Sequence, residues 1–83
     1  MKGVFKTTAD LPDDGQADMV ARCDIPFVPS VGDMLAITAR GDYWCVDDVY
    51  WNCQRPDVVE VFVSHPRSRS MADYLLKQGW QEA

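Results

Sequence analysis

The sequence contains no long apolar run, no closely spaced cysteine pair and only one histidine. Because no stretch of about eighteen apolar residues occurs, no transmembrane helix is predicted. The chain turns polar by residue 6, which is not the pattern of a secretory signal segment. The three cysteines, Cys23, Cys45 and Cys53, form no C-x-x-C motif. We therefore expect a cytoplasmic protein with free thiols; a Cys45–Cys53 disulfide is the less favoured alternative.

Positive charge is also scarce. The 83 residues include 8 Lys and Arg against 13 Asp and Glu, which gives a net charge of −5. Residues 1–48 hold nine of the acids and four of the bases, so the acidic excess lies in the first half. A surface that follows nucleic-acid phosphates needs clustered Lys and Arg, so direct nucleic-acid binding is not expected. The acidity instead favours solubility and a basic partner.

One short basic run, HPRSRS at residues 65–70, is the exception. Two arginines are too few for a nucleic-acid footprint on an acidic chain, so we interpret the run as a solvated linker. The alternative is a small anion-binding cluster made of Arg55, His65, Arg67, Arg69 and Lys77.

Turn signals divide the chain into short segments. Residues 17–25 alternate between apolar and polar side chains, which is typical of a half-buried strand, and Asp14-Gly15 before them favours a hairpin turn. Residues 26–33 contain two prolines and predict an irregular loop that packs Phe27 and Val28. Strands are expected at residues 4–9, 17–25, 34–39, 43–51 and 58–63.

The last segment has the composition of a helix. Residues 71–78 are good helix formers, Gly79 suits the position just after a helix, and Ser70 followed by Asp73 resembles a capping box. We expect a helix over residues 70–79. The sequence therefore predicts one mainly β domain, a small five-stranded antiparallel barrel with a single C-terminal helix.

The segment YWCVDDVYW, residues 43–51, places Asp47 and Asp48 inside an otherwise apolar strand. The apolar residues before and after the two acids are out of phase in a regular strand, where side chains alternate between faces. A β-bulge at the acids would add one residue and reset the phase. We therefore predict a bulge and a shared interior for Trp44, Val46, Val49 and Trp51.

The same acids have an alternative role. Asp47 and Asp48, with Asp42 and His65, are candidates for a metal or acid–base site, because hard cations bind converging oxygen atoms. Adjacent strand residues point to opposite faces, so these two carboxylates do not converge without help. A nucleophilic Cys53 would have only His65 as a base. We expect no catalytic residue, no metal and no cofactor.

Three stretches carry a resemblance to a known fold: DIPFVPSVGDML, YWCVDDVYW and VVEVFV. They span residues 24–63, about half of the chain. In this order they resemble SH3-like barrels, and more closely a set of small bacterial and phage-borne proteins. The resemblance implies the fold and carries no activity with it.

Aromatic residues are dense in the fourth predicted strand. If Trp44 and Trp51 face the interior, the tyrosines of that strand face outward together with one side of strand 58–63. Tyrosine is enriched at binding hot spots, and exposed apolar patches mark interfaces. The predicted protein interface consists of Tyr43, Tyr50, Val58, Glu60 and Phe62.

These features favour a non-enzymatic protein-interaction module. Its expected partner is another protein or a second copy of the chain, with no nucleic acid and no membrane. Self-association is favoured because a core of this size supplies only about 3–5 kcal/mol. The alternative is a small acidic inhibitor, encoded by a mobile element, that binds a nucleic-acid-handling protein.

Overall fold

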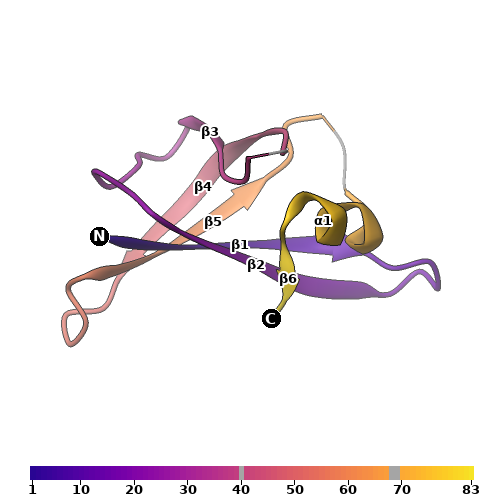
Figure 1. Ribbon diagram of the computed structural model, residues 1–83, viewed down its shortest axis with the longest axis horizontal. Coiled ribbons are helices and arrows are strands. Elements are labelled where there is room, and N and C mark those ends of the chain that lie inside the picture. The colour runs from indigo at the N-terminus through magenta and orange to yellow at the C-terminus, as the bar shows by residue number, and fades with distance from the viewer. Residues whose placement is uncertain (40, 68–69) are drawn as a thin grey trace.

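The computed structural model describes residues 1–39, 41–67 and 70–83. In this part of the chain, six strands form one sheet and a single short helix packs against it (Figure 1). A mainly β chain with one helix after the long strands is therefore confirmed. The elements in chain order are β1 (Lys2–Asp10), β2 (Gln16–Asp24), β3 (Met34–Ala36), β4 (Tyr43–Trp51), β5 (Val58–Ser64), α1 (Ala72–Gln78) and β6 (Gln81–Glu82).

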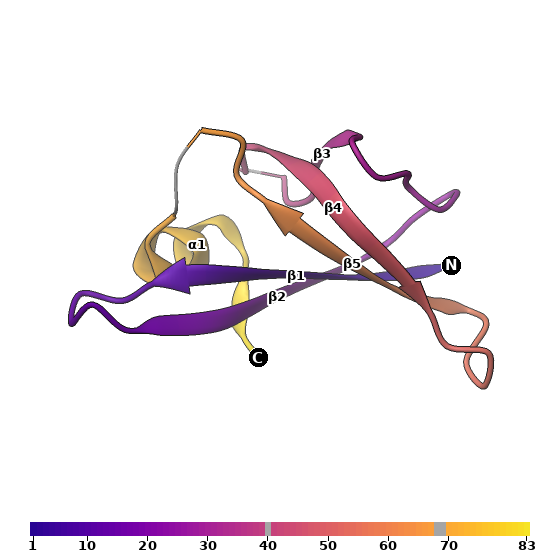
Figure 2. The ribbon, with the colours of Figure 1, turned by 180° about the vertical axis from the view of Figure 1, so that it is seen from behind.

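The sheet is open. Its strand order is β3-β4-β5-β1-β2-β6, so β3 and β6 form opposite edges and the expected closed barrel of five strands is not observed. The pairing of β1 with β5 is parallel, and all other described pairs are antiparallel. Figures 1 and 2 show β4 and β5 running obliquely to the β1–β2 hairpin, with α1 on one side of that hairpin.

The β1–β2 hairpin follows the predicted turn chemistry. Asp14 has a φ of 66°, the left-handed conformation that such a turn requires. The Gly15 N–H donates to Asp13 Oδ1 at 3.1 Å, and the Leu11 N–H donates to the Gly15 carbonyl at 2.9 Å. The strands then pair without interruption from Asp10↔Gln16 to Lys2↔Asp24. The hairpin prediction is confirmed.

The predicted bulge in β4 is also confirmed. Val46 pairs with Val63 and Asp48 pairs with Phe62, so Asp47 is the extra residue. Trp44, before the bulge, is only 1% exposed and packs on Trp80 with ring centroids 5.1 Å apart.

The expectation that Trp51 is buried beside Trp44 is wrong, because Trp51 is 49% exposed. Because the bulge shifts the side-chain alternation of β4 by one residue, Trp51 does lie on the inner side, opposite Val59, which is fully buried. However, Trp51 lies seven residues further along β4, roughly 23 Å at strand spacing, beyond the Trp80 and His65 rings that pack on Trp44. The bulge sets the face of the side chain, but burial requires an element above that face.

The core lies between the sheet and α1. Burial of this apolar surface is the main source of stability. The fully covered cluster consists of Phe5, Ala9, Met19, Ala21, Trp44, Val46, Val59, Val61, Val63, Ala72, Leu75 and Trp80.

The helix begins later than predicted. It starts after Met71, without a side-chain cap, so the expected capping box of Ser70 and Asp73 is not formed. The Ser70 carbonyl instead accepts the Asp10 N–H at 2.9 Å, which ties the chain to the end of β1. The predicted helix end is confirmed, since Gly79 has a φ of 109° and closes the last turn.

Two loop expectations need correction. β3 covers only residues 34–36 rather than 34–39, because the chain turns at Thr38, whose carbonyl accepts the Gly41 N–H at 3.1 Å. The irregular loop before β3 is present, but Phe27 does not pack inward and is 70% exposed. Val28 is partly buried against the core, as expected.

Candidate interaction surface

We call the face of the sheet that α1 does not cover the outer face. Register and alternation define its residues: Asp48 lies beside Phe62, which lies beside Lys6 on β1. Tyr50 lies beside Glu60 in the next row. The long strands thus bring together side chains that are more than forty residues apart in sequence.

Contacts hold this group in one arrangement. The rings of Tyr50 and Phe62 meet edge to face, with centroids 5.5 Å apart and planes at 85°. Lys6 Nζ lies 5.8 Å from the centroid of the Phe62 ring and 2.7 Å from Glu60 Oε1. Because the ion pair is partly exposed, it adds little stability, but it fixes the position of Lys6 over the ring. Tyr50 nevertheless remains 53% exposed and Phe62 38% exposed.

All five residues of the predicted interface lie on the outer face, but not as one patch. Tyr50, Glu60 and Phe62 form the group described above, and Val58 lies two residues before Glu60 on β5. Tyr43 is 64% exposed but starts β4, seven residues from Tyr50. Whether any of them contacts a partner stays a prediction.

Sequence reasoning missed several residues of this surface. A depression of about 310 Å³ beside Tyr50 is lined by Arg22 and Arg55, among others. A second, more open one of about 680 Å³ extends over Asp48 and Phe62. Arg22 is 38 residues from Glu60 in sequence and reaches this area only through the pairing of β1 with both β2 and β5. No local pattern signals such a contact.

The acid and histidine set is only partly assembled. Asp42 Oδ2 lies 3.5 Å from His65 Nε2, and the His65 ring meets Trp44 edge to face at 5.7 Å. The His65 Nδ1 atom accepts the Arg67 N–H at 3.2 Å. Asp47 and Asp48 are exposed and belong to no such pair among the described residues. Within the same residues, no group of three potential ligands is placed to hold a metal ion.

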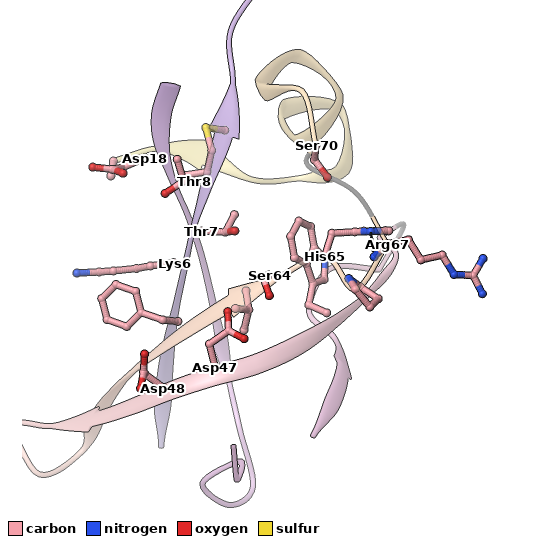
Figure 3. Close-up of a pocket in the computed structure, with 16 residues that line it drawn as sticks. Lys6, Thr7, Thr8, Asp18, Asp47, Asp48, Ser64, His65, Arg67 and Ser70 are labelled. Atoms are coloured by element: carbon pink, nitrogen blue, oxygen red, sulfur yellow. Dashed lines mark hydrogen bonds between the residues drawn. The ribbon is translucent and has the colours of Figure 1, made fainter. Parts of the chain in front are cut away.

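A cleft of about 840 Å³ opens where β1 and β5 diverge after the Lys6↔Phe62 pair (Figure 3). Thr7, Ser64 and Asp47 lie around its middle, whereas Arg67 extends away from it. A serine nucleophile needs a free histidine nitrogen as its base. At His65, Nδ1 accepts the Arg67 N–H at 3.2 Å and Nε2 lies 3.5 Å from Asp42 Oδ2.

The remaining candidates from the sequence do not converge. Arg55 precedes β5 and Arg67 follows it, so the proposed basic cluster is split between opposite ends of one strand. Arg69, its other arginine, lies outside the described residues.

The three cysteines are free, Cys53 is exposed, and the alternative Cys45–Cys53 disulfide is absent. These two residues lie eight positions apart along β4 and the following loop, too far for a disulfide. Burial, with a smaller effect of the Asp24 charge, raises the pKa of the Cys23 thiol. Among the residues described, no helix is long and apolar enough to cross a membrane.

Comparison with known proteins gives no match: no family model, curated protein or solved structure is significantly similar to this chain.

Proposed function

We propose that this chain is a non-enzymatic protein-interaction module that binds its partner through the outer face around Tyr50 and Phe62. The supporting observation is the edge-to-face aromatic pair of Tyr50 and Phe62, because both rings are more than one-third exposed and are held in place by their neighbours. Rings that are already oriented lose little side-chain entropy when a partner covers them.

The partner is another protein or a second copy of the chain. Light scattering after size exclusion tests the second version. A dimer that becomes a monomer on Phe62→Ser supports self-association, and a monomer at all concentrations excludes it. The proposal includes a cytoplasmic location, which the free thiols support, and a relationship to SH3-like barrels.

The proposal as a whole is tested by capture from a lysate of the native host, with bound proteins quantified for three forms of the chain. Tyr50→Ser should lower the amount of at least one captured protein tenfold or more relative to the unaltered chain. Tyr74→Ser is the matched control, because Tyr74 is 50% exposed but lies on α1. Equal loss in both variants, or loss in neither, contradicts binding through the outer face.

A second candidate is an acidic inhibitor of a nucleic-acid-handling protein. Its support is three exposed carboxylates, those of Asp18, Asp47 and Asp48, which all line the cleft beside the outer face. Such carboxylates would occupy a basic channel in the target. Captured proteins should then be released by added DNA or RNA. Retention in the presence of both nucleic acids excludes this version.

A further inference from the structure

Strand β4 is paired on both sides along only half of its length. β3 pairs with Tyr43 to Cys45, and Val46 extends this contact: its N–H donates to the Asp33 carbonyl at 2.9 Å and its carbonyl accepts the Gly32 N–H at 2.8 Å. Beyond the bulge, the residues described here pair β4 with β5 alone. The second half of β4 is therefore an open sheet edge.

Backbone alternation shows which groups face that edge. The Lys2 N–H donates to the Asp57 carbonyl, so the odd-numbered residues of β5 direct their backbone groups toward β1. The even-numbered residues Glu60 and Phe62 then face β4 and bond with their partners there. The N–H and C=O groups of Val49 and Trp51 consequently point to the open edge.

Side chains at this edge suit an added strand. Trp51 is 49% exposed on the inner side and Tyr50 is 53% exposed on the outer side, so an incoming strand meets an aromatic ring on either side. Natural proteins protect open edges with Pro, charged side chains, β-bulges or a covering element. Here the bulge and the charges of Asp47 and Asp48 lie at the start of the edge, whereas the segment from Val49 to Trp51 contains neither Pro nor a charged residue.

The two aspartates indicate the chemistry of the occupant. Neither carboxylate has an ion-pair partner among the described residues, and the whole chain carries a charge of −5. A second copy added at the same edge would bring two such acid pairs within a few residues of each other, which is unfavourable. A strand with Lys or Arg next to these acids would gain complementary charge.

We propose that the open edge of β4, at Val49 and Trp51, accepts an extended, basic segment of the partner protein as an additional strand of the sheet. The inference rests on the proposed function, because it specifies how and with what chemistry a partner binds beside Tyr50. Backbone hydrogen bonds supply the register, and Asp47 and Asp48 select the charge.

The direct test is an NMR titration of the full chain, labelled with ¹⁵N, with the peptide acetyl-Lys-Thr-Lys-Val-Lys-Thr-Lys-amide. The expected Kd is on the order of 0.1–1 mM, because a short flexible strand must be ordered on binding. The largest shifts should occur at the amides of Val49 and Trp51, and these two amides should exchange more slowly with water. A peptide with Glu at each Lys position should not bind.

Two methylated peptides separate strand pairing from simple charge attraction. In one peptide the backbone nitrogens of all four Lys residues are methylated, and in the other those of the Thr and Val residues. Each peptide therefore lacks the backbone N–H donors along one side of the strand. Strand addition predicts at least a tenfold loss of affinity for one peptide and little loss for the other. Equal binding of both, equal loss of both, or no shift at Val49 and Trp51 overturns the proposal.

A charge variant completes the design. The double variant Asp47→Asn, Asp48→Asn should weaken binding of the unmethylated peptide at least threefold, while the same amides shift. An unchanged affinity contradicts the charge assignment. If the peptide tests fail but Tyr50→Ser still reduces capture, strand addition at the β4 edge is rejected and binding through the outer face is retained. Successful peptide binding with no effect of Tyr50→Ser on capture would reject the outer face instead.

Discussion

Individual residues of the same type have opposite environments in this molecule. Trp44 is buried under Trp80, whereas Trp51 is half exposed on the same strand and the same side of the sheet. Tyr50 and Phe62 are exposed, but their rings meet edge to face and Lys6 lies over the Phe62 ring. Residue type and alternation predicted the side of the sheet on which each ring lies. They did not predict burial, which depends on what packs above the ring.

Truncating the two tryptophans should therefore have very different effects. Trp44→Ala should lower the free energy of unfolding by about 3–5 kcal/mol, which is the whole stability expected of a chain this small. Trp51→Ala should cost about 1 kcal/mol or less, because half of the side chain is already in water. Circular dichroism in buffer shows whether each variant is folded, and urea denaturation measures the loss of stability of any variant that is. Similar losses in the two variants would contradict the burial described here.

The cysteines should differ in reactivity for a related reason. Burial raises the pKa of Cys23, so at a given pH less of it is the reactive thiolate. At pH 8, iodoacetamide should modify the exposed Cys53 before Cys23, and the rate at Cys23 should keep rising as the pH is increased past 9. Mass spectrometry of timed samples gives the order. Cys23 reacting before Cys53 would be incompatible with this arrangement.

At the scale of single elements, the local sequence predicted a feature correctly where its pattern is compatible with only one structure. The Asp14-Gly15 turn, the bulge at Asp47 and the helix end at Gly79 all follow from local chemistry. The start of α1 does not, because the Ser70 carbonyl bonds to β1 instead of the chain forming a capping box. That choice depends on a strand sixty residues away, which no local pattern contains.

The bulge makes a sharp prediction about deletions. Removing Asp47 alone leaves Val46↔Val63 next to Asp48↔Phe62, which is an ordinary ladder, so the variant should fold with a loss below about 2 kcal/mol. Removing both Asp47 and Asp48 moves every later side chain of β4 to the other face and should abolish folding. Amide NMR spectra show whether each of the two variants is folded. A folded double deletion would rule out Asp47 as the extra residue.

At the scale of the whole molecule, the open sheet depends on strand pairings that no local sequence pattern predicts. β1 pairs in parallel with β5, with Lys2 opposite Val58, and the tail of the chain pairs with β2 as β6, so the sheet stays open. The same pairing assembles the outer face from β1, β4 and β5. Alternation identified Tyr50, Val58, Glu60 and Phe62 as outward-facing, but Lys6 and Arg22 entered the surface only through the order of the strands.

The central claim, that the outer face around Tyr50 binds protein, is tested most directly by ¹⁹F NMR. The chain has three tyrosines, Tyr43, Tyr50 and Tyr74, so labelling with 3-fluorotyrosine gives one signal from β4 beside Phe62 and an internal reference on α1. In a lysate of the native host, the Tyr50 signal should shift or broaden while the Tyr74 signal stays as in buffer. An unchanged Tyr50 signal, or equal broadening at Tyr74, would contradict the account.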